Sequence, residues 1–193
     1  MFDIVQIICW SITYVLIIIA GIMGFRDKKV SMPYVAGILN FSWEICAFWG
    51  SGGFWGHSLW LFLDVGIVIL SVRCIKENKG KLLYAVAVLV SFVVLKFVFS
   101  MQSGMLFSVF VIDLIMAVFF LIEREKLSGR IKIPIAFMKL LGDIFAGVYY
   151  APQSKFVAVL ALLVFFCNTS YLYLCIGEIE AKAGVPMHSR ITE

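Results

Sequence analysis

Four carboxylic acids lie within long apolar stretches of this sequence: Glu44, Asp64, Asp113 and Asp143. An ionisable group inside a bilayer is costly, so its presence there indicates a functional site by default. An acid surrounded by apolar groups is disfavoured in its charged form and tends to keep its proton. Such an acid can donate the proton to a substrate or bind a polar solute. These residues therefore indicate acid catalysis or solute binding within a membrane.

Two lysines also lie in apolar stretches, and each has an acid within reach. Lys139 and Asp143 are four residues apart, so they share one face of a helix and can pair there. Lys96 and Asp113 flank a short connection between two apolar segments, and we expect them to meet across it. Pairing of this kind is the purely structural explanation for a buried charge. It accounts for both lysines and for two of the four acids.

Glu44 and Asp64 are left without a lysine, and we predict that they are the catalytic acids. At 1.5 Å per residue, both lie roughly 10 Å from the helix ends that the connection Gly50–His57 joins. Asn40 precedes Glu44 by one helical turn and is expected to orient it. Trp43 is adjacent to Glu44, and Trp60 lies one turn before Asp64. Because aromatic faces stabilise cations, both tryptophans are predicted to contact a substrate.

The elements that must position these residues are membrane-spanning helices. Hydrophobic residues make up 63% of the 193-residue chain and charged residues 15%, a composition that excludes a water-soluble domain. Backbone groups in lipid must pair within their own segment, so each span is a helix. We predict an all-α, polytopic membrane protein, with residues 1–193 forming a single transmembrane domain. The seven predicted spans are Ile4–Phe25, Met32–Trp49, Ser58–Val72, Leu82–Met101, Leu106–Ile122, Ile133–Tyr150 and Phe156–Ile176.

Positive charges alternate between the connections in a way that predicts the orientation. The first, third and fifth connections each contain three or four lysines or arginines, whereas the second and fourth contain none and the sixth only Lys155. Lysine and arginine stay on the cytoplasmic side, which places Met1 outside and Glu193 inside a cell membrane. The net charge of +4 is thereby explained without nucleic acid as a partner. His57, in the second connection, can reach the mouth of an outward-facing cavity.

A short internal repeat suggests two related halves. Val30–Pro33 precedes Glu44 as Ile131–Pro134 precedes Asp143, and each proline is expected to open a span. This pattern is compatible with two three-helix bundles joined by the fourth helix. Asp143 would then occupy a place in the second half like that of Glu44 in the first.

The segment Met32–Glu44, with its Met-Pro and Asn-x-x-Trp-Glu pattern, and the segment Leu59–Val65 resemble a known family. They are similar to the small seven-helix membrane-bound terpene cyclases of fungal meroterpenoid and indole-diterpene pathways and their bacterial relatives. The resemblance implies cyclisation of a lipophilic, prenylated small molecule through protonation of an alkene or epoxide, with neither metal nor cofactor. It places Glu44 at the position of one family acid. Asn168, near Tyr171, stands where the family has an aspartate, so Asp64 or Asp143 would supply the second acid and the others would bind substrate.

Two other functions fit the same pattern. A small solute transporter of the three-plus-one-plus-three type would have the same orientation and internal repeat, with polar groups at mid-membrane. A scaffold or subunit would use its acids only to hold helices together. No feature of the sequence specifies an oligomeric state. A cavity beside Glu44 favours the first two functions over the third.

Overall fold

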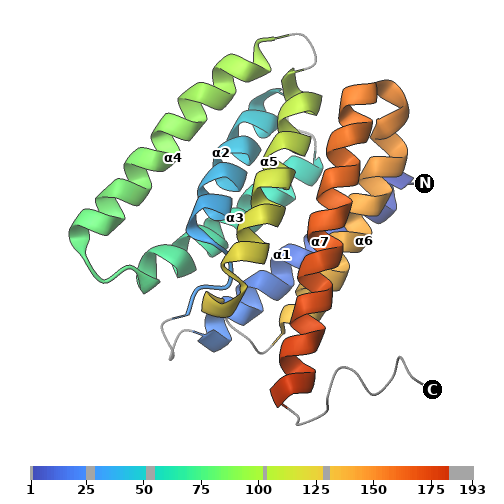
Figure 1. Ribbon diagram of the computed structural model, residues 1–193. Coiled ribbons are helices and arrows are strands. Elements are labelled where there is room, and N and C mark those ends of the chain that lie inside the picture. The colour runs from blue at the N-terminus through green and yellow to red at the C-terminus, as the bar shows by residue number, and fades with distance from the viewer. Residues whose placement is uncertain (1, 25–28, 51–54, 102–103, 128–130, 183–193) are drawn as a thin grey trace, which may run out of the picture.

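The computed structural model describes residues 2–24, 29–50, 55–101, 104–127 and 131–182, which form seven α-helices joined by short connections (Figure 1). This confirms the predicted all-α class and the seven helical segments. The helices are α1 (Phe2–Gly24), α2 (Tyr34–Gly50), α3 (Trp55–Cys74), α4 (Asn78–Phe99), α5 (Gly104–Ile122), α6 (Lys132–Tyr150) and α7 (Lys155–Lys182). Single turns of 3₁₀-helix, η1 (Arg124–Lys126) and η2 (Ala151–Gln153), follow α5 and α6.

Six of these helices are long and apolar enough to cross a membrane. The exception is α2, whose 17 residues are at the short end of what a bilayer span requires. Pro33 immediately precedes α2, and its carbonyl accepts the first helical hydrogen bond, from the Gly37 N–H. Proline suits a helix start because its missing N–H has no partner there. The helix lengths and hydropathy make the chain a multi-pass membrane protein.

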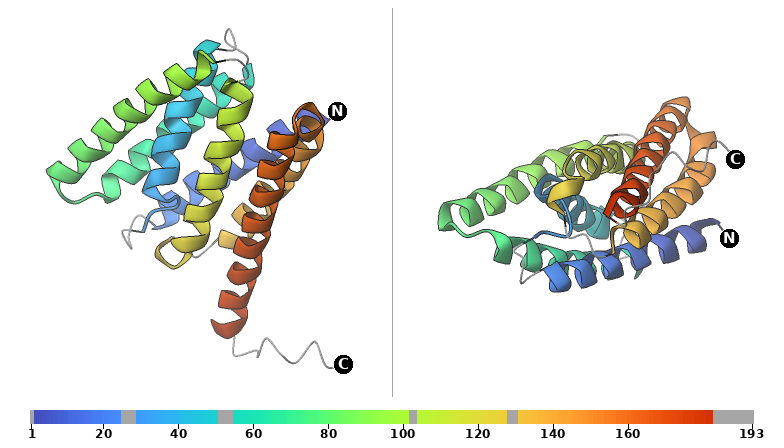
Figure 2. Two further views of the ribbon diagram at one scale, coloured as in Figure 1. Left: turned by 45° about the horizontal axis from the view of Figure 1, so that its top comes forward. Right: turned by 60° about the horizontal axis from the view of Figure 1, so that its bottom comes forward.

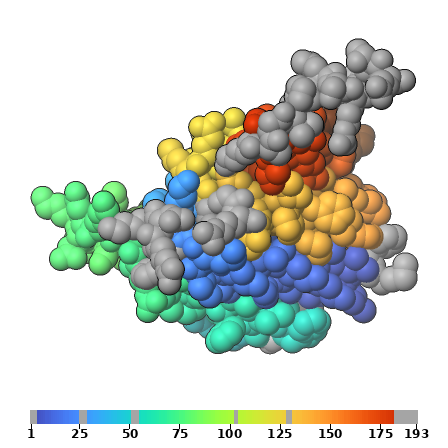
Figure 3. Space-filling view, turned by 90° about the horizontal axis from the view of Figure 1, so that it is seen from below, coloured from blue at the N-terminus to red at the C-terminus, as the bar shows by residue number. Residues whose placement is uncertain are grey.

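Six helices form a ring around the centre of the molecule. In the first half, α3 packs against both α1 and α2, and in the second half α7 packs against both α5 and α6. The halves join where α1 packs on α6 and where α2 packs on α5. Exchanging the two halves leaves this set of contacts unchanged. Figure 3 shows part of the ring from below, where α3, α1, α6 and α7 follow one another.

The fourth helix lies outside the ring. It packs mainly on α2, and Figure 2 shows it on the side away from α1, α6 and α7. Tyr84 and Leu95 are its buried residues, while leucines, valines and a phenylalanine along its length are largely exposed. Such an apolar surface belongs in lipid. The arrangement agrees with two three-helix units connected by α4.

The contact between α1 and α6 depends on a glycine. A Cβ atom added at Gly142 would lie 2.3 Å from the Trp10 Cδ1 atom and 2.6 Å from its Nε1 atom. The Trp10 ring therefore occupies the space that any larger residue at this position would need. Small residues allow helices in membranes to approach one another closely.

We expect Gly142→Ala to destabilise the protein by roughly 1–3 kcal/mol, because the added methyl group must displace the indole of Trp10. The measurement is the free energy of unfolding in detergent or nanodiscs. Gly50→Ala is the matched control, since a Cβ there meets no atom within 4 Å. Equal stability of the two variants would contradict the close contact.

The positive charges described in the structure gather at the turns expected to face the cytoplasm. The α3–α4 and α5–α6 turns lie at the lower end of the molecule in Figure 1, and the α6–α7 turn lies at its upper end. Arg73, Lys76 and Lys79 are next to the first of these turns, and Arg124, Lys126 and Lys132 to the second. Met1, Arg26, Lys28, Arg130 and Glu193, which also enter the orientation argument, lie outside the described residues.

Orientation can be tested with single cysteines in a chain whose five native cysteines are replaced. We expect Gln153→Cys to react with an impermeant maleimide in intact cells. Lys79→Cys should react only after permeabilisation, because lysine-rich connections stay on the cytoplasmic side. Both side chains are exposed, so a difference in labelling reports the side of the membrane. The reverse labelling pattern would invert the predicted orientation.

Candidate functional site

Two adjoining cavities lie within the ring of helices. The inner one has a volume of about 50 Å³ and the outer one about 470 Å³, and Trp10, Trp43, Val109 and Asp113 line both. The inner cavity is bounded by α1, α2, α5, α6 and Met32. The outer one also reaches α3, the end of α6 at Tyr150, and Gln153 in η2. Together they form a chamber that extends toward the end of the molecule opposite the lysine-rich turns.

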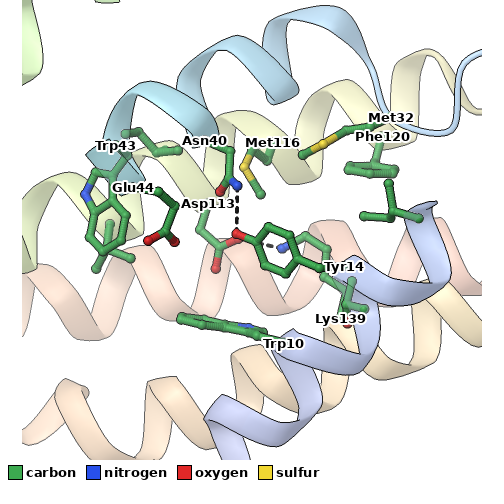
Figure 4. A pocket seen from close by; sticks show the side chains of 14 residues that line it. Trp10, Tyr14, Met32, Asn40, Trp43, Glu44, Asp113, Met116, Phe120 and Lys139 are labelled. Atoms are coloured by element: carbon green, nitrogen blue, oxygen red, sulfur yellow. Dashed lines mark hydrogen bonds and ion pairs between the residues drawn. The ribbon is translucent and has the colours of Figure 1, made fainter. Parts of the chain in front are cut away.

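Glu44 lies on the wall of the inner cavity and is 2% exposed. Figure 4 shows its carboxyl group pointing into the cavity, between Trp43 and Asp113. One carboxyl oxygen, Oε2, is 3.2 Å from Nδ1 of His57. No lysine or arginine in the described part of the chain forms an ion pair with Glu44. The acid predicted from its place in α2 therefore faces a cavity, with the His57 imidazole and the Tyr14 hydroxyl as its hydrogen-bond partners.

Asn40 binds residues other than the expected one. The sequence suggests that it orients Glu44, but its amide nitrogen lies 2.8 and 3.0 Å from the two carboxyl oxygens of Asp64. The same nitrogen is 2.7 Å from the hydroxyl of Tyr14, which lines the inner cavity. Asp64 is 1% exposed and is not part of the wall of either cavity. It is positioned to act on the chamber through Asn40.

The second half contains a buried charge cluster. Lys139 forms ion pairs with Asp113 on α5 and with Asp143 one turn along α6, the latter at 3.0 Å. The pairing of Lys139 with Asp143 is confirmed. The predicted pairing of Lys96 with Asp113 is wrong, because α4 lies outside the ring and Lys96 is exposed on it. A single lysine thus forms ion pairs with two acids.

Asn168 also belongs to this cluster. Its amide nitrogen donates a hydrogen bond to Asp143 Oδ2, although its sequence position suggests a site closer to the cytoplasm. Its carbonyl oxygen is buried and has no hydrogen-bond partner among the described residues. Tyr171, one turn further along α7, is 1% exposed and packs on Phe120, with ring centroids 5.5 Å apart. Asp143, Asn168 and Tyr171 lie behind the chamber wall and do not form part of it.

Tryptophans join the halves and line the chamber. Trp10 on α1 donates its indole N–H to Asp143 on α6, at 2.9 Å. Trp43 on α2 donates to the Ser108 hydroxyl on α5, also at 2.9 Å. When the two halves are exchanged, the contact between α1 and α6 takes the place of the contact between α5 and α2. Both indoles line the chamber, so each supplies an aromatic surface there while its polar atom is satisfied.

A histidine lies among these aromatic rings. His57 is part of α3, not of the connection before it, and it lines the outer cavity. Its ring contacts Trp43 and Trp60 edge to face, with centroids 5.5 and 5.4 Å away. The indole of Trp60 donates to Ser11 at 3.1 Å. The predicted site residues Trp43 and Trp60 therefore share a wall with His57, which reaches the cavity as expected.

Sequence reasoning missed several residues of the chamber wall, among them Trp10 and Tyr14. Both lie on α1, which has no Asp, Glu, Lys, Arg or His between Ile4 and Gly24 to indicate a site. The available signal was their spacing of four residues, which puts both on one helix face. His188, the second histidine, lies outside the described residues. No group of three or more histidine, cysteine, aspartate or glutamate side chains among the described residues is arranged to hold a metal ion.

Comparison with known proteins assigns no family. No protein-family model matches the chain, and no curated protein or solved structure is detectably similar to it. The resemblance to membrane-bound terpene cyclases therefore remains a hypothesis that rests on Met32–Glu44 and Leu59–Val65. The established features are seven helices, six of which could span a membrane, and a chamber beside Glu44.

Replacing Lys139 should be far more damaging than replacing Lys96. Lys139→Met leaves two buried acids without their counter-charge, which should cost roughly 3–5 kcal/mol in free energy of unfolding. Lys96→Met is the matched control, because that side chain is exposed on the lipid-facing helix, and we expect no destabilisation. Thermal or denaturant unfolding in detergent measures both. Equal losses would show that the Lys139 cluster does not stabilise the ring.

Proposed function

We propose that this protein is a membrane-embedded cyclase in which Glu44 protonates the end of a prenyl chain and so starts cationic ring closure. The observation that carries the proposal is the position of Glu44, a buried carboxyl group that faces an aromatic chamber. No lysine or arginine among the described residues forms an ion pair with it. Poor hydration favours the neutral acid, which is the form that can donate a proton. Asp113, the other acid on the chamber wall, is paired with Lys139.

The two volumes favour a chain that enters with its tail first. About 50 Å³ beside Glu44 has room for the tip of an alkyl chain, whereas about 470 Å³ lies within the range of small-molecule sites. The reacting double bond or epoxide would lie in the inner cavity. The remainder of the chain would fold against Trp10, Trp43 and Trp60 in the outer one.

The chamber wall suits a carbocation. Indole faces attract positive charge, and the cation would pass three of them as ring closure proceeds from the tip toward the head of the substrate. Water is a competing nucleophile, and a chamber lined mainly by apolar and aromatic side chains limits it. Holding the chain folded also supplies the proximity that ring closure requires.

The charges on the chamber wall also limit which substrate head groups can bind. Among the residues that line the two cavities, the sole lysine or arginine is Lys139, and both its partners are acids. A diphosphate group would need cationic partners, and Lys139 is already paired with two acids. The substrate class is therefore a prenyl chain attached to a neutral head group. This agrees with a start by protonation, since no diphosphate has to leave.

The direct test is turnover by purified protein in nanodiscs. The probes are geranyl and farnesyl phenols, each with a terminal alkene or a terminal epoxide. We expect cyclised isomers from at least one probe, and a rate roughly 10²- to 10⁴-fold lower for Glu44→Gln, which cannot donate a proton. Glu77→Gln is the control, because Glu77 is exposed before α4 and lines neither cavity. Normal cyclisation by Glu44→Gln would reject Glu44 as the acid.

A transporter is the second candidate, because the ring is built from two halves that are interchangeable in their contacts. Paired three-helix units around a central site are a recurrent design of carriers. Proteoliposome uptake separates the two functions. A carrier would move a solute across the bilayer without changing it, whereas the cyclase would convert its probe and transport nothing.

A further inference from the structure

We infer that His57 is a second proton-transfer residue of the chamber, which takes the proton released at the end of ring closure and returns it to Glu44. This inference rests on the proposed cyclase function. It answers a question that the function leaves open: after each turnover the buried Glu44 is a carboxylate and must regain a proton where water is scarce.

His57 lies on the wall of the outer cavity and contacts Glu44 on the wall of the inner one. Its Nδ1 atom is 3.2 Å from Glu44 Oε2, a distance over which a proton can pass directly. Glu44 lines the inner cavity, whereas His57 lines the outer one. Trp43 and Trp60 hold the imidazole edge to face, and the residue is 7% exposed. The acid that would start the reaction and the base that would end it thus lie in hydrogen-bond contact.

The order of events matches this placement. The Glu44 O–H bond breaks as its proton bonds to the chain tip, on carbon for an alkene or on oxygen for an epoxide. Successive C–C bonds then carry the positive charge away from the tip and into the outer cavity. There a C–H bond beside the cation breaks, its electron pair becomes a C=C bond, and the free Nε2 atom of the imidazole takes the proton. The imidazolium gives its Nδ1 proton to the Glu44 carboxylate, so the product is an isomer of the substrate. Water at the mouth of the outer cavity then removes the Nε2 proton and supplies one to Nδ1, which restores the starting tautomer.

The charges around His57 favour such a relay. The ionisable groups nearby are Glu44 on α2, Asp64 two helical turns along α3, Tyr14 on α1 and Asp113 across the cavity on α5. The charge of Asp113 is opposed by Lys139. An imidazolium beside the newly formed Glu44 carboxylate is therefore a short-lived ion pair, which proton transfer neutralises.

The test compares first and later turnovers of His57→Gln. Glutamine can still donate a hydrogen bond to Glu44 but cannot carry a proton. We expect both the first turnover and the steady state to be roughly 10²-fold slower than wild type, with KM little changed, because the variant lacks the base that ends ring closure and the group that returns a proton to Glu44. A wild-type steady state in His57→Gln would overturn the relay and leave His57 a positioning residue. A first turnover at the wild-type rate, followed by a slow steady state, would show that another group ends ring closure and would also overturn the relay as stated.

Chemical rescue gives a second readout that a structural role would not produce. His57→Ala opens space beside the outer cavity, and we expect imidazole, but not the equally sized pyrrole, to restore steady-state turnover. Pyrrole has an N–H group but no basic nitrogen. Rescue by both compounds, or by neither in a variant that unfolds at the wild-type temperature, would reject proton transfer through the ring.

An infrared measurement distinguishes failure of the relay from failure of the cyclase function. The carboxylic C=O band of Glu44, identified by its loss in Glu44→Gln, should shift in His57→Phe, which keeps a ring but has no nitrogen. A band that does not move would overturn the proton contact whatever the substrate is. A shifted band with no turnover of any probe by the wild type would reject the cyclase function and leave the contact standing.

Discussion

Polar side chains inside this bundle must find their partners within the protein, because lipid offers none. Lys139 shows the consequence most clearly. It is 4% exposed, and its ammonium group holds Asp113 on α5 and Asp143 on its own helix. Asp143 in turn accepts hydrogen bonds from Trp10 on α1 and Asn168 on α7. One buried cluster therefore ties four helices together, and it closes the ring where the two halves meet.

The same requirement makes Glu44 conspicuous. Its neighbours Asp64 and Asn40 satisfy each other, as do Lys139 and its two acids. Glu44 faces open space and has an imidazole as its partner, whose charge depends on protonation. A group that only held helices together would have no need of an adjoining cavity. An acid, a histidine and three tryptophans line the chamber formed by the two cavities, and this combination is the basis for the proposed chemical function.

The two halves have the same arrangement of helices, but they place the acid and the amide of their buried pairs on different helices. In the first half the amide is on α2 and the acid on α3, as Asn40 and Asp64. In the second half the acid is on α6 and the amide on α7, as Asp143 and Asn168. Asn168, where the family resemblance leads one to expect an aspartate, donates a hydrogen bond to Asp143. As a result, the second half contains the ion-paired cluster around Lys139, while the first half places Glu44 at the cavity.

The sequence by itself determined the helices, because length and hydrophobicity decide which segments lipid can hold, and each predicted span overlaps an observed helix. It also singled out Glu44, since an acid in an apolar segment is costly wherever it points. Only the tertiary structure decided the partners. Lys96 and Asp113 are close in sequence but do not meet, while Trp10 and Asp143 are 133 residues apart and do. Pairing depends on which helix faces are turned inward, and that follows from the packing of the whole ring.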